Sequence, residues 1–131
     1  MEYNVKGLNE LSKQLNNCVK KVGFNNNDVP LRIALIHSEI SEAFEAFRKD
    51  KFANNVEFKQ LMKGYNSDNS PISFKAHFEQ QIKDTLEDEI ADSIIRLLDF
   101  CAYMDIDIEF HIQQKMQYNE MRGFKYGGKK F

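Results

Sequence analysis

Residues 30–49 read PLRIALIHSEISEAFEAFRK, and the periodicity of this stretch predicts a long amphipathic helix. Asp28 or Asn27 can cap its first turn, where Pro30 is tolerated because a missing N–H costs little there. At about 100° per residue, Glu39 and Glu42 fall on a strip with apolar neighbours and not on the polar side of the helix. The remaining apolar positions form one face: Ile33, Ile36, Ile40, Ala43, Phe44 and Phe47.

The acid pair on this helix has two interpretations. Two carboxylates at the edge of a buried sector are costly unless a cation meets them, and a metal ion is the obvious candidate. Alternatively, both side chains reach water at the rim of the core, as charged residues usually do. This helix alone leaves both interpretations open.

Composition bounds the class of protein. The 131 residues predict one domain, and the net charge of −2 offers no broad basic field to nucleic acid. Six glycines and two prolines favour helices over a turn-rich β fold. Cys18 and Cys101 show no CxxC or zinc-ligand spacing, which favours a reducing compartment. Both lie in apolar helical stripes, so we expect them to be small core residues. Without a signal-peptide core or a membrane-length apolar run, we expect a soluble, cytoplasmic protein with no membrane partner.

Three further helices are predicted. One covers about residues 5–22 and ends at Gly23, and another covers about residues 108–122 after a cap at Asp107. The third pattern covers about residues 73–103 after a cap at Ser73, and a break near Asp84–Thr85 is left open. We expect residues 50–83 to be an irregular insertion between the second and third core helices, in which residues 56–62 can form a short helix. We expect residues 123–131 to be a flexible basic tail. We therefore expect an all-α four-helix bundle, whose wide apolar sectors favour a homo-oligomer.

Two more sets of polar residues can do chemistry. Glu89 and Asp92 stand at i and i+3 in LEDEIADSIIRLLD, although a charged strip is by itself typical of a solvated helix face. Lys115, Asn119 and Arg122 stand in one row on the last helix, where they either grip phosphate oxygens or form a wet face. In combination, four carboxylates on two helices could converge on one or two Mg²⁺ ions, with the basic row holding a polyphosphate.

The order of these motifs resembles a known family. The motifs are Glu-x-x-Glu at Glu39 and Glu42, Glu-x-x-Asp at Glu89 and Asp92, and Lys-x-x-x-Asn-x-x-Arg at Lys115, Asn119 and Arg122. The set resembles the MazG-like all-α nucleoside triphosphate pyrophosphohydrolases, a superfamily related to the dimeric dUTPases and dCTP pyrophosphatases. The resemblance extends from about residue 31 to residue 128. The gap between the two acid motifs is longer than in compact members, so base preference is not carried over.

The resemblance implies an activity and a site. The enzyme would cleave an NTP or dNTP between the α and β phosphates, giving the monophosphate and pyrophosphate, in nucleotide-pool sanitation. Glu39, Glu42, Glu89 and Asp92 would hold Mg²⁺, for which Mn²⁺ could substitute, and one glutamate would orient or deprotonate the attacking water. Lys115, Asn119 and Arg122 would contact phosphate or sugar. The family implies a homodimer or homotetramer.

One alternative function stays open. A non-catalytic helical module could keep the same scaffold and sense a nucleotide or bind a partner. Two other classes are set aside, because no histidine follows a glutamate at the Glu-x-x-His spacing of di-iron bundles and no glycine-rich phosphate loop is present. Metal-dependent release of pyrophosphate separates the enzyme from the module.

Overall fold

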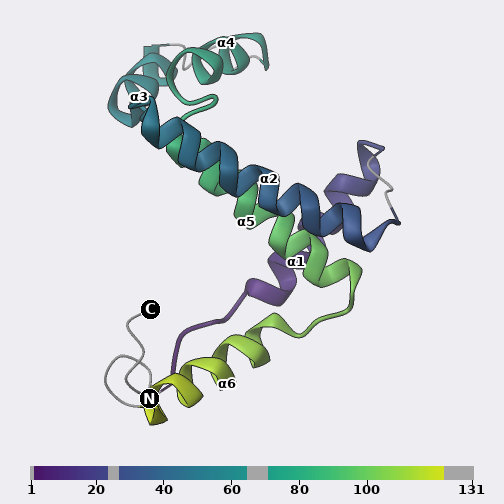
Figure 1. Cartoon of the computed structure of the whole chain (residues 1–131). Coiled ribbons are helices and arrows are strands. Elements are labelled where there is room, and N and C mark those ends of the chain that lie inside the picture. The colour runs from purple at the N-terminus through teal and green to yellow at the C-terminus, as the bar shows by residue number, and fades with distance from the viewer. Residues whose placement is uncertain (1, 24–26, 65–70, 123–131) are drawn as a thin grey trace. The chain divides into compact units, whose positions relative to one another are not determined.

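The computed structural model describes residues 2–23, 27–64 and 71–122, and over these ranges the chain is helical without a strand (Figure 1). The helices there are α1 (Leu8–Lys21), α2 (Val29–Arg48), α3 (Asn55–Gly64), α4 (Pro71–Gln81), α5 (Leu86–Tyr103) and α6 (Ile108–Met121). The predicted all-α class is therefore confirmed for the described part of the chain. Among these helices, none combines the length and the apolar character needed to cross a bilayer.

The chain divides into two compact units. The central unit comprises Asp28–Arg96, and the terminal unit comprises Met1–Asn27 with Leu97–Phe131. Helices α2, α3, α4 and the first part of α5 belong to the central unit. Helices α1 and α6 and the end of α5 belong to the terminal unit.

Helix α2 has well-defined ends in the central unit. The Asp28 carboxylate accepts a hydrogen bond from the Leu31 N–H at 3.1 Å, as the sequence predicted. Asp50 then adopts a left-handed conformation with φ of 54°, and the Lys51 N–H bonds back to the Ala46 carbonyl at 2.9 Å. This is the hydrogen-bond pattern of a Schellman stop, with aspartate in the place that glycine usually takes. The buried side of α2 consists of Ile36, Ala43 and Ala46.

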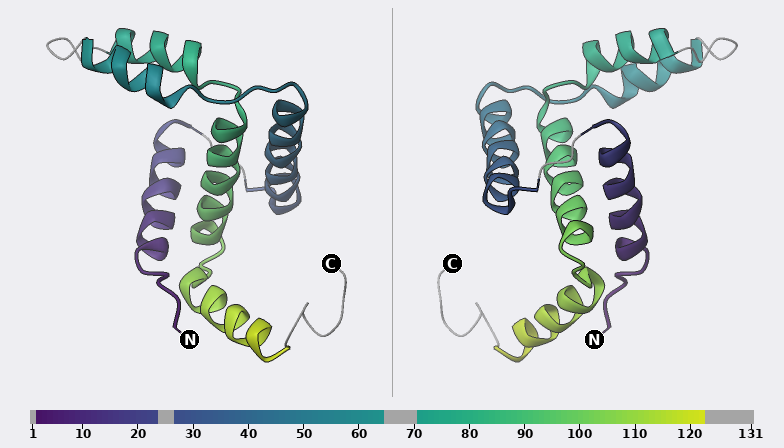
Figure 2. Two further views of the ribbon diagram at one scale, coloured as in Figure 1. Left: turned by 90° about the vertical axis from the view of Figure 1, so that its left-hand side faces the viewer. Right: turned by 90° about the vertical axis from the view of Figure 1, so that its right-hand side faces the viewer.

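The region predicted as an irregular insertion contains two helices, one over the predicted short helix and one over the start of the predicted pattern at residues 73–103. Helix α3 packs side by side with α4 (Figures 1 and 2). The Phe58 ring meets the Phe74 ring edge-on with centroids 6.0 Å apart. Ser73, the predicted cap, lies inside α4, which begins at Pro71. Contacts between the two helices stabilise this hairpin, and the periodicity of each helix does not reveal that the two helices pair.

The break that the sequence left open occurs between α4 and α5. Asp84 is left-handed with φ of 63°, and the Thr85 hydroxyl accepts a hydrogen bond from the Asp88 N–H at 3.3 Å. The Leu86 N–H also donates to the Lys51 carbonyl at 2.9 Å. Thr85 therefore starts a new helix whose first turn is tied to the end of α2.

Polar contacts hold the terminal unit together. Helix α1 packs against α6. The Asn16 amide donates to the Asp99 carboxylate at 2.8 Å, and the Ser12 hydroxyl donates to the Leu98 carbonyl; these four residues are buried. The Asp107 cap of α6 is confirmed, since its carboxylate accepts from the backbone N–H three residues later.

The two cysteines have different surroundings. Cys101 is buried, as predicted for a small core residue, whereas Cys18 is exposed, so that prediction was wrong. Burial raises the pKa of the Cys101 thiol.

The predicted loops around residues 24–26 and 65–70, and the predicted flexible tail at residues 123–131, lie outside the described residues. The single-domain organisation stays a prediction.

Candidate metal centre

Carboxylates from α2 and α5 converge in the central unit. One carboxylate oxygen each from Glu39, Glu89 and Asp92 lies within 4.8 Å of the others. Helix α2 supplies Glu39, and the first two turns of α5 supply the other two one turn apart. We call these three residues the first triad. Their spacing allows a single cation to contact all three.

Glu89 is the most unusual member of the first triad. Only 5% of the residue is exposed, and its Oε2 atom makes no hydrogen bond. Burial, followed by the adjacent Glu42 carboxylate and then the charges of Asp92 and Glu39, raises the pKa of Glu89 to about 7. A buried, unpartnered carboxylate oxygen among other acids is costly for the chain alone. A cation at this position would supply the missing partner.

The other predicted ligands lie around Glu89. Glu42 is exposed, and its carboxylate contributes to the raised pKa of Glu89, but it does not belong to the first triad. Burial, followed by the charges of Asp88 and Glu39, raises the pKa of Asp92, and Arg96 opposes this shift. The Glu42 carboxylate therefore lies next to the Glu89 carboxylate but outside the first triad.

Arg96 partly compensates the negative charge. Its Nε atom donates to a Glu39 oxygen at 2.7 Å, and the Glu39 side chain is only 12% exposed. The ion pair holds the Glu39 side chain against the middle of α5. One guanidinium faces several carboxylates, so the cluster keeps excess negative charge.

A second group of acids shares Glu89. Oxygen atoms of Asp84, Asp88 and Glu89 also lie within 4.8 Å of one another, and we call these the second triad. The Asp84 N–H donates to the Asp88 carboxylate at 2.9 Å. The sequence analysis missed Asp84 and Asp88. Asp88 could have been found, because it stands four residues before Asp92. Asp84 depends on a left-handed turn that has no periodicity.

The predicted phosphate-binding row lies in the terminal unit. Lys115 Nζ stands 5.2 Å from the centre of the Tyr118 ring, and the Arg122 guanidinium carbon stands 5.6 Å from it. Both cations therefore gather at one aromatic side chain. Asn119 lies between them in sequence, and its carbonyl accepts from the Arg122 N–H at 3.3 Å. Their contact with phosphate or sugar stays a prediction.

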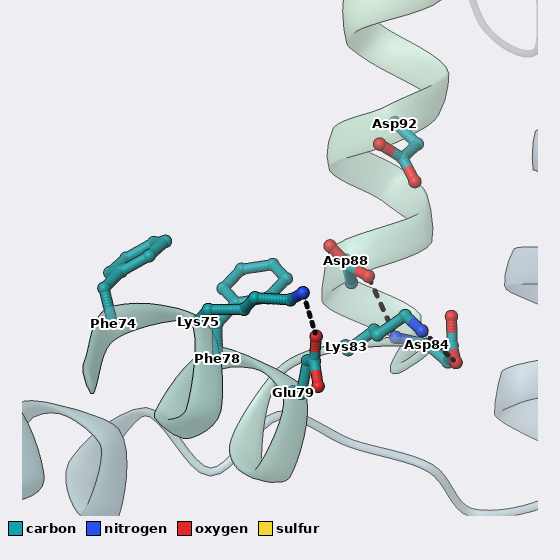
Figure 3. A pocket seen from close by; sticks show the side chains of 8 residues that line it. All are labelled: Phe74, Lys75, Phe78, Glu79, Lys83, Asp84, Asp88 and Asp92. Carbon is teal, nitrogen blue, oxygen red and sulfur yellow. Dashed lines mark hydrogen bonds and ion pairs between the residues drawn. The ribbon is translucent and has the colours of Figure 1, made fainter. Parts of the chain in front are cut away.

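A cavity of about 400 Å³ adjoins the carboxylates in the central unit (Figure 3). Asp88 and Asp92 of α5 and Asp84 of the preceding turn line it, so it is bordered by one member of the first triad and two members of the second. The side chains lining it from α4 and the following turn are Phe74, Lys75, Phe78, Glu79 and Lys83. A space of this size suits a small organic ligand.

The donor set suits a hard divalent cation. Every ligand atom in the two triads is a carboxylate oxygen, which Mg²⁺ and Mn²⁺ accept. The orphaned Glu89 oxygen is the observation that favours a cation over a solvated helix face.

No family model matches the chain, and the searches of curated proteins and of solved structures give no match either.

Proposed function

We propose that this chain is a Mg²⁺-dependent nucleoside triphosphate pyrophosphohydrolase. It would cleave an NTP or dNTP between the α and β phosphates and release the monophosphate and pyrophosphate. The observation that carries the proposal is the buried, unpartnered Glu89 oxygen within two groups of carboxylates. The motif order that resembles the MazG-like family supports the same activity. Nucleotide-pool sanitation is the cellular role that this activity would serve.

Each acid has a task in this proposal. Glu39, Glu89 and Asp92 would hold the cation, and Arg96 would compete with it for the Glu39 carboxylate. Bound Mg²⁺ supplies a water of lowered pKa and neutralises phosphate charge. Glu42, which is exposed beside Glu89, would accept the proton of the water that attacks the α-phosphorus.

The basic row completes the proposal. Lys115, Asn119 and Arg122 would contact the triphosphate or the sugar, and the leaving pyrophosphate would depart with its charge partly neutralised. In this proposal α1, α2, α5 and α6 form the core of a MazG-like four-helix bundle. The α3–α4 hairpin is then the insertion between its second and third helices.

Exposed apolar residues support the proposed homo-oligomer, a dimer or a tetramer. In the central unit, α2 and α5 carry large side chains that are 46–63% exposed: Ile40, Phe44, Phe47, Ile90 and Ile94. Monomers rarely leave such a set uncovered. A second copy of the chain would bury them.

Pyrophosphate release from a panel of NTPs and dNTPs tests the activity. We expect release with Mg²⁺ or Mn²⁺ and none with EDTA. Asp92→Asn should reduce turnover at least a hundredfold, because it removes one ligand of the cation, while the circular dichroism spectrum stays unchanged. Glu10→Gln, an exposed acid in the first turn of α1, is the matched control and should retain full activity. Nucleotide binding without pyrophosphate release in folded wild type would favour the non-catalytic sensing module.

A further inference from the structure

The cavity beside the carboxylates has two chemically different ends (Figure 3). Phe74 and Phe78 of α4 form an aromatic end. Asp92, a member of the first triad, and Asp84 and Asp88, members of the second, form the acidic end. A ligand whose phosphates are held through cations at the acids would therefore extend toward the aromatic rings.

The aromatic rings at this end pack against one another yet stay partly exposed. The Phe74 and Phe78 rings stack with centroids 5.8 Å apart and an angle of 28° between their planes. Phe58 of α3 meets Phe74 edge-on. Phe74 nevertheless remains 48% exposed. Neighbouring rings thus hold this side chain in place while much of it is left for a further aromatic partner.

The cavity is lined by charged side chains as well as aromatic ones, which a pocket for a purely apolar ligand would lack. Lys75 Nζ lies 3.9 Å from a Glu79 oxygen, and Lys83 Nζ lies 4.0 Å from an Asp84 oxygen. All four side chains are about half exposed or more, so their hydrogen-bonding groups are available at the rim. They supply donors and acceptors beside a stacking surface, which is the combination that recognises a heteroaromatic base.

We propose that this cavity is the nucleobase pocket, with the base stacked on Phe74 and its polar edge met by the Lys75–Glu79 pair. The α3–α4 hairpin thereby sets which nucleotide the protein prefers. The inference rests on the proposed nucleotide substrate and adds the part of the site that reads the base.

Binding of two probes by isothermal titration calorimetry tests this pocket. One probe is a non-hydrolysable α,β-imido nucleoside triphosphate with Mg²⁺, for each common base. The other is Mg²⁺-tripolyphosphate, which has the phosphates and no base. Phe74→Leu should weaken binding of the preferred nucleotide about five- to a hundredfold, which is the range expected for one lost base–aromatic stack. It should leave tripolyphosphate binding unchanged. Phe74→Tyr, which keeps the ring, should retain nucleotide affinity.

Phe52→Leu is the matched control. Phe52 is 49% exposed in the same unit and also has one edge-on phenylalanine neighbour, Phe47 at 6.3 Å, but it does not line the cavity. It should bind both probes as wild type does. Equal nucleotide affinity in wild type and Phe74→Leu, with pyrophosphate release intact, would overturn the pocket and leave the proposed function standing. Base-dependent binding that Phe74→Leu removes, without pyrophosphate release, would support the pocket and overturn the hydrolase. No nucleotide binding by folded wild type would overturn both.

Discussion

Replacing Glu89 by glutamine tests two effects of its buried carboxylate: the loss of stability that it causes in the metal-free protein, and the stabilisation that it allows when Mg²⁺ binds. Glutamine keeps the shape of the side chain and removes its charge. In the folded chain the pKa of Glu89 is about 7, against an ordinary value of 4.5. Between these two pH values the folded chain keeps a proton that the unfolded chain has released. The free energy of unfolding of metal-free wild type should therefore fall as the pH rises through this window.

The size of the effect follows from the same two pKa values. A difference of this size corresponds to at most roughly 3.5 kcal/mol, since each tenfold change in proton affinity is about 1.4 kcal/mol. The buried glutamine amide also lacks a full set of partners, and the neighbouring acids relax around the charge. We therefore expect Glu89→Gln to stabilise the metal-free protein by about 1–2 kcal/mol at pH 8. This corresponds to a rise in Tm of roughly 3–10 °C.

Thermal unfolding in EDTA at pH 8 and pH 5 measures this effect. The advantage of Glu89→Gln should be largest at pH 8 and shrink at pH 5, where wild-type Glu89 is protonated. Glu10→Gln is the control, because Glu10 also lies in the first turn of a helix but is exposed. The two variants share the helix-dipole contribution and differ in burial.

Addition of Mg²⁺ should reverse the order of stability. The ion should raise the Tm of wild type at pH 8, because it binds the folded state and supplies the partner that Glu89 lacks. It should do little for Glu89→Gln, and less for wild type at pH 5, where protons compete for the ligand. A Glu89→Gln protein that melts at or below the wild-type temperature in EDTA at pH 8 would refute this reasoning.

Three further predictions concern other contacts. Asn16→Ala should cost about 1–3 kcal/mol in urea unfolding, because the buried Asp99 carboxylate loses its amide donor; a cost under 0.5 kcal/mol would contradict this. Asp28→Ala should cost about 1 kcal/mol through the lost cap of α2, and Asp28→Asn should restore most of it. Arg96→Gln should tighten Mg²⁺ binding roughly three- to tenfold in calorimetry, because it removes a competing cation from Glu39; weaker binding would instead show that Arg96 positions Glu39 for the ion.

Two of these variants have matched controls. Asn17→Ala alters an exposed neighbour of Asn16 on α1 and should stay within about 0.5 kcal/mol of wild type. Arg48→Gln removes an exposed arginine that pairs with Glu45 at 3.2 Å, away from the acid cluster. It should leave Mg²⁺ affinity unchanged.

Local patterns predicted the helices that carry the carboxylates. Periodicity placed a helix at residues 30–49, and α2 covers Val29–Arg48. The caps at Asp28 and Asp107 could be found because a cap is a contact within one turn. The pairing of α3 with α4 could not be found in the same way, because it is a contact between two helices and not within one turn. Asp50 and Asp105 end α2 and α5 in a left-handed conformation that sequence rules assign first to glycine.

The candidate site likewise has features that follow from local sequence patterns and features that follow only from tertiary packing. The sequence by itself determined which carboxylates share a helix face, since residues three apart on a helix must be neighbours. Only the tertiary structure brought Glu39 to Glu89 and Asp92, left one Glu89 oxygen buried without a partner, and added Asp84 and Asp88 through a turn. It also placed the aromatic rings of α4 beside the acids. Helical periodicity acts over a few residues of chain, whereas burial and the meeting of two helices depend on long-range packing that no local pattern encodes.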